Sequence, residues 1–138
     1  MLSHKLAKPV GTLFFGLLFA TNVALVTAAH AAPDDYRFEL VGKPVVSGGK
    51  DLVQVRLVHI PDNKPVPNAV IFETTADMSP GGMGSMTAPV TAIPGDKAGI
   101  YSFDVAPTFT GTWALKLAAK VQGETETVRG TVDVDLVQ

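Results

Sequence analysis

The stretch DMSPGGMGSMTAP, residues 77–89, brings together three thioether side chains, Met78, Met83 and Met86. The initiator methionine is the only other one in the chain. Thioether sulfur is a soft, uncharged ligand that suits Cu(I), and it needs no deprotonation to bind. The interspersed glycines permit a tight backbone wrap, so the spacing could place three sulfurs around one ion. A Cu(I) site in a loop over these residues is therefore one interpretation of the spacing.

Two other interpretations of the same methionines stay open. They could fill gaps at the open end of a folded domain, since methionine packs adaptably. They could also form an adaptable docking surface for a partner protein. His59 is a further candidate metal ligand, provided that its strand end approaches the methionines; otherwise it is a histidine at the rim of the core.

The inventory of reactive side chains argues against an enzyme. After residue 31 the chain has a single histidine, His59, and the whole chain has no cysteine, so a nucleophile with a supported base is not available. Asp133 and Asp135 share the polar face of one strand and are expected to be solvated. Neither a calcium loop nor a set of zinc ligands is recognisable. We expect no catalytic residues.

The N-terminus has the features of an export signal. A basic start with Lys5 and Lys8 precedes an apolar run, which ends in the cleavage pattern Ala29-His30-Ala31. We expect a signal peptide over residues 1–31 and a mature domain over residues 32–138 located in the periplasm. An uncleaved membrane anchor is the alternative.

The mature segment carries no strong positive charge. Without the two lysines of the leader, nine basic residues face 13 acidic ones, a net charge of −4. No nucleic-acid partner is expected, because a phosphate backbone is bound through clustered positive charge.

Apolar residues alternate with polar ones throughout the mature segment, which is typical of antiparallel strands with one buried face. Val53, Val55 and Leu57 share one expected inner face. Turn-forming residues separate the alternating runs. The expected strands lie in YRFELV, DLVQVRLVHI, AVIFET, GIYSFDV, TWALKLAAKV and ETVRGTVDVDLV. The pattern predicts an all-β, immunoglobulin-like antiparallel β-sandwich of about seven strands, with a small closed barrel as the second possibility.

Several short motifs follow one another in a recognisable order. KPVPNAVI is followed by the methionine stretch, then by GIYSFDV and by FTGTWALKLAAKV, over roughly residues 36–136. This order resembles the YtkA-like/FixH-like family of exported domains. The matching positions are Pro65, Val66, Ala69, Ile71, Met78, Met83, Gly99, Tyr101, Gly111 and Trp113.

This resemblance implies a sandwich on the outer side of the inner membrane that is associated with copper. It favours a protein that binds or hands over Cu(I), with a membrane copper transporter, efflux or oxidase-assembly protein as its partner. A metal-free accessory domain that docks on such a complex is the alternative function. Family members often carry a histidine beside the methionines, whereas this stretch has none, which favours Cu(I) over Cu(II).

Overall fold

The computed structural model describes residue 11 and residues 33–95 and 97–138. Apart from Gly11, the expected signal peptide lies outside the described residues, as does its cleavage pattern. In the part of the chain that is described, no helix is long and apolar enough to cross a membrane.

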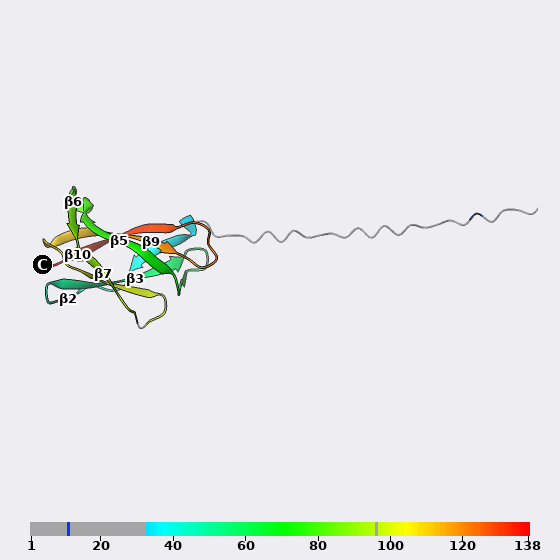
Figure 1. The fold of residues 1–138 in the computed structure, drawn as a ribbon, viewed down its shortest axis with the longest axis horizontal. Helices are drawn as coiled ribbons and strands as arrows, with labels where there is room; N and C mark the ends of the chain where they lie inside the picture. Colours follow the sequence, from blue (N-terminus) through cyan, green and yellow to red (C-terminus); the bar gives the residue numbers. More distant parts are fainter. Residues whose placement is uncertain (1–10, 12–32, 96) are drawn as a thin grey trace, which may run out of the picture.

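The strands form two antiparallel sheets that face each other (Figure 1). The first sheet has the order β1-β3-β8-β7, and the short strands β2 and β4 also pair with β3. Its strands are β1 (Tyr36–Leu40), β2 (Val45–Ser47), β3 (Lys50–His59), β4 (Lys64–Pro65), β7 (Val90–Ile93) and β8 (Ile100–Val105). The second sheet has the order β10-β9-β5-β6, with β5 (Val70–Met78), β6 (Met83–Ala88), β9 (Gly111–Lys120) and β10 (Val128–Leu136). Short 3₁₀ turns cover η1 (Pro33–Asp35) and η2 (Ser79–Gly81). The predicted β-sandwich is confirmed.

The core lies between the two sheets, as the alternating pattern of apolar residues predicted. Val53, Val55 and Leu57 of β3 are fully buried, and Trp113 on β9 faces them from the other sheet's side of the core. Inner-face residues of β8 and β10 complete the same cluster. Burial of these apolar side chains supplies the main driving force for folding, since the chain has no disulfide.

Residues expected to form a methionine loop instead form a β-hairpin. Strand β5 continues to Met78, the chain turns through η2, and Met83–Ala88 returns as β6 on the outer edge of the second sheet. The turn closes with a bond from the Gly82 amide to the Ser79 carbonyl (2.9 Å), and Gly82 adopts a φ of 75° that favours glycine. The loop prediction was wrong because the glycines and proline are needed only for this short turn.

Close packing joins the two sheets along one side. A Cβ at Gly130 of β10 would lie 2.6 Å from the ring of Phe38 on β1, so only glycine leaves room for that ring.

The side chain of Tyr101 holds a neighbouring loop by two hydrogen bonds. Its hydroxyl accepts a hydrogen bond from the Ala69 amide and donates one to the Val66 carbonyl, each 2.9 Å long. These contacts fix the segment that enters β5.

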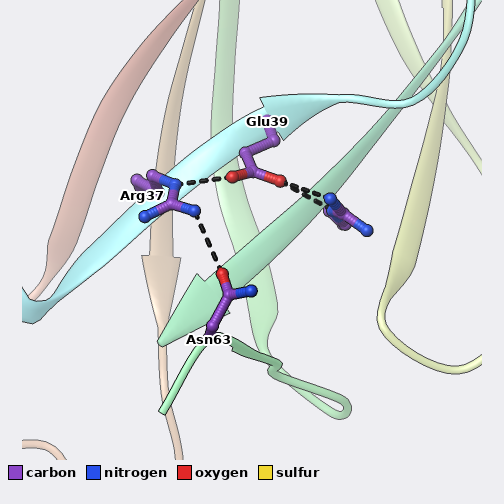
Figure 2. A network of polar contacts seen from close by, with 4 residues as sticks. Arg37, Glu39 and Asn63 are labelled. Carbon is purple, nitrogen blue, oxygen red and sulfur yellow. Dashed lines mark hydrogen bonds and ion pairs between the residues drawn. The ribbon is translucent and has the colours of Figure 1, made fainter. Parts of the chain in front are cut away.

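An ion-pair network fixes β1 on β3. The Glu39 carboxylate accepts hydrogen bonds from Arg37 and Arg56, and Arg37 also donates to the Asn63 side chain (3.2 Å). Figure 2 shows the Arg37 guanidinium joined to both the Glu39 carboxylate and the Asn63 side chain. The two guanidinium groups hold the pKa of the Glu39 carboxyl below its usual value. The network joins β1, β3 and the turn after β3, near the end of the sandwich that holds His59.

Candidate functional site

The three methionines of the hairpin line one pocket. Met78 ends β5, whereas Met83 and Met86 come from β6, and Met78 lies opposite Met83 in the register. The pocket has a volume of about 310 Å³, and Phe109 and Thr110 complete its wall. Met78 is 6% exposed, while Met83 is 44% exposed at the rim. The structure therefore brings the three predicted sulfur ligands together around one hollow.

The carboxylate of Asp77 holds the turn that positions these side chains. One oxygen accepts a hydrogen bond from the Ser79 amide (2.9 Å), and the other pairs with the Lys116 ammonium on β9 (2.6 Å). These bonds, first that from Lys116, lower the pKa of Asp77 from 3.8 to about 2. Asp77 thus remains ionised across ordinary pH and ties the start of the turn to the neighbouring strand.

Phe109 and Thr110, in the segment that leads into β9, form part of the pocket wall. Phe109 is 52% exposed, and its backbone carbonyl accepts a hydrogen bond from the Trp113 indole (3.0 Å). A Cβ at Gly111 would lie 3.0 Å from the terminal methyl of Met78, so this strand start passes close to the pocket floor. Phe109 and Thr110 were not among the site residues predicted from the sequence. The signal that could have identified them is an aromatic residue within the turn APTFTG.

His59 lies at the opposite end of the sandwich from the pocket. The start of β3 is beside the pocket, because Asp51 accepts a hydrogen bond from the Val137 amide (2.8 Å) and Gln138 donates to Thr110 (3.0 Å). His59 lies eight residues further along the same strand, about 26 Å away at the usual rise per residue. Figure 1 shows β6, β2 and the C terminus together at the left, and β1, whose first residue pairs with His59, beginning at the other end. His59 therefore does not join an ion held by the methionines.

His59 has partners for its Nδ1 atom and its ring within the protein. Its Nδ1 lies 2.9 Å from the Asp62 carboxylate, and the contact lowers the pKa of Asp62. The Tyr36 ring lies 5.1 Å from the imidazole, centroid to centroid, and its hydroxyl donates to Glu124 (2.8 Å). Burial and this bond to Glu124 raise the pKa of Tyr36 to about 12. This arrangement fits the interpretation of His59 as a histidine at the core's rim.

The chemistry available at the methionine pocket is that of a soft, neutral site. Its lining has three thioethers, a phenyl ring and one hydroxyl. Across the described residues, no group of three or more histidine or carboxylate side chains could hold a metal ion. Ligands of this kind suit Cu(I) or Ag(I) and give little affinity for Ca²⁺, Mg²⁺ or Zn²⁺.

Comparisons with known proteins place the chain in a family. No curated protein matches its sequence. Among solved structures, the "ZirS C-terminal Domain" aligns with a TM-score of 0.40 at 13% sequence identity, covering 99% of this chain and 88% of that one. The family model described as YtkA-like matches residues 30–118, which is more than half of the chain. The chain therefore belongs to the YtkA-like family.

Proposed function

We propose that this protein binds Cu(I) through Met78, Met83 and Met86 and hands the ion to a partner with stronger ligands. The observation that carries the proposal is the convergence of the three side chains on one pocket, from two strands of one hairpin. Scattered methionines would instead favour packing or docking alone. Thioethers are the donors that Cu(I) prefers among those in this pocket.

Transfer by ligand exchange agrees with the graded exposure of the three sulfurs. Met78 is buried and Met86 packs against the core, so these two side chains are held by the fold. Met83 is nearly half exposed on the edge strand, where an incoming ligand can replace it first. Neutral ligands add no ionic attraction to the cation, which favours release over permanent storage.

We also place this activity in the periplasm. The proposal is supported by the basic, apolar and small-residue order of residues 1–31. Within the YtkA-like/FixH-like resemblance, the cleavage pattern Ala29-His30-Ala31 favours a soluble domain over the membrane-anchored FixH branch. The protein's partner would be a membrane copper transporter, efflux or oxidase-assembly protein.

The test is a competition titration of Cu(I) between the protein and a chromogenic chelator. The native protein is expected to bind one ion, and a variant with Met78, Met83 and Met86 all changed to leucine is expected to bind none. Leucine keeps the apolar bulk and removes the sulfur. His59→Gln is the matched control and should bind as the native protein does. If the native and triple-leucine proteins compete equally with the chelator, the copper site is refuted.

A metal-free docking role is the second candidate. The observation that favours it is the exposure of three large apolar side chains, Met83, Phe109 and Val137, near one end of the sandwich. The triple-leucine variant separates the two functions, because it keeps this apolar surface. A variant that retains partner binding while losing Cu(I) would show that docking depends neither on the sulfur atoms nor on a bound ion.

A further inference from the structure

The sulfurs of the pocket differ sharply in their access to solvent. Met83 is 44% exposed, Met78 is 6% exposed, and Met86 is partly buried against the core. The chain has no cysteine, so these thioethers are the sulfur atoms of the described residues. Met83 is therefore the most solvent-exposed of the three methionine residues.

The local sequence leaves the Met83 side chain unshielded. Its neighbours Gly82 and Gly84 carry no side chains. A Cβ at Gly81 would lie 3.7 Å from the Met83 terminal methyl, an ordinary contact distance, so the turn passes beside Met83 with a residue that has no side chain. Strand β6 is also the last strand of its sheet, and no further strand of the described chain covers its outer edge.

We infer that Met83 is a site of reversible sulfoxidation, and that its oxidation switches off soft-metal binding at the pocket. The second half of this inference rests on the proposed function. The oxidant is a small peroxide such as hydrogen peroxide. A sulfur lone pair attacks one peroxide oxygen, the O–O bond breaks, and an S–O bond forms. The departing hydroxide takes the proton of the transferred oxygen and leaves as water. Sulfur loses two electrons and the peroxide gains them.

Oxidation would change both the donor atom that Met83 offers to a metal ion and the polarity of the pocket rim. A sulfoxide is polar and presents a hard oxygen, which Cu(I) and Ag(I) bind poorly in comparison with a thioether. It also places a dipole beside the exposed ring of Phe109, in an otherwise apolar rim. The remaining pair of sulfurs, on Met78 and Met86, would hold the ion with only two donors.

The first experiment measures where oxygen is added. The purified, metal-free protein is treated with limiting hydrogen peroxide, and each sulfoxide is located by fragmentation mass spectrometry. If the rate follows exposure, Met83 reacts about sevenfold faster than Met78, in proportion to 44% against 6%. Saturation with Ag(I), a soft and redox-inert probe, should slow the reaction at Met83. Equal rates at Met83 and Met86 would overturn the inference.

The second experiment measures the consequence for binding. Protein oxidised only at Met83 is titrated with Cu(I) against the chelator, beside native protein and Met83→Leu. We expect an affinity about tenfold or more below the native value, as for loss of one sulfur donor. Methionine sulfoxide reductase should restore the native affinity, because it regenerates the thioether.

The outcomes separate this inference from the proposed function. If native protein binds Cu(I), the triple-leucine variant does not, and Met83 oxidation leaves the affinity unchanged, only the inference is overturned. If native protein does not bind Cu(I) at all, the proposed function fails and the inferred switch fails with it. Selective oxidation of Met83 with reversible loss of affinity supports both.

Discussion

The ion pair between Asp77 and Lys116 should contribute measurably to stability, because it ties the methionine hairpin to the centre of its sheet. The change Asp77→Asn tests this contribution with little loss of shape. An asparagine oxygen can still accept the hydrogen bond of the Ser79 amide, so the variant removes the charge and keeps the turn. What is lost is the 2.6 Å contact with the Lys116 ammonium.

The size of the effect follows from the pKa of the Asp77 carboxyl. A decrease from 3.8 to about 2 corresponds to roughly 2.4 kcal/mol if it is counted in full. Part of this shift comes from the bonds to Ser79, which the variant keeps, and the Lys116 side chain is 47% exposed, so that solvent screens its charge. We therefore expect Asp77→Asn to lower the free energy of unfolding by about 1 to 2 kcal/mol at neutral pH.

The same pKa gives the pH dependence and its sign. Because the folded-state pKa lies below the unfolded one, the carboxylate stabilises the native state once it is ionised in both states. The advantage of native protein over Asp77→Asn should be complete above about pH 4 and should be lost as the pH falls through about 2. A difference that stayed constant between pH 6 and pH 2 would contradict an electrostatic origin.

Urea unfolding followed by tryptophan fluorescence is the assay, and a double-mutant cycle with Lys116→Met isolates the pair. The matched control is the cycle for Glu73 and Arg129, which pair across the same sheet at 3.1 Å with both side chains more than half exposed. That control pair should couple by less than about 0.5 kcal/mol. Equal coupling in the two cycles would refute the reasoning from burial.

Two further substitutions test the packing that supports the site. Gly130→Ala places a methyl group 2.6 Å from the Phe38 ring and should cost about 1 to 3 kcal/mol of stability in urea unfolding, whereas Gly84→Ala meets only ordinary contacts and should cost little. Tyr101→Phe leaves two backbone groups without their partner and should cost about 1 to 2 kcal/mol, while Tyr36→Phe leaves only the Glu124 carboxylate without its partner and should cost less. Equal losses within either pair, measured by the same unfolding assay, would contradict these assignments.

Alternation of apolar residues was enough to predict most of the sandwich. It identified the buried faces of β3, β8, β9 and β10, because a strand with one solvated face must alternate. It did not identify β6, whose sequence MGSMTA has weak strand preference and only becomes a strand through pairing with β5. The four-residue β7 was missed for a similar reason, since a segment so short shows no clear period.

The candidate site was only partly predictable. The three methionines are neighbours in sequence, so their convergence needed no knowledge of the fold. Phe109 and Thr110 reach the pocket because the segment before β9 packs against the hairpin, and sequence alone does not show such tertiary contacts. The placement of His59 depended on the direction of β3, and a strand's direction relative to a distant turn cannot be read from local pattern.

The hydrogen bond from the Trp113 indole to the Phe109 carbonyl also has a spectroscopic consequence. The chain's single tryptophan is fully buried, so its fluorescence emission should be blue-shifted. Its indole is bonded to the backbone of Phe109, whose side chain lines the methionine pocket. An ion or an oxidised side chain that displaces Phe109 would alter the environment of the indole directly. The native protein thus carries its own fluorescent reporter of pocket occupancy, with no added label.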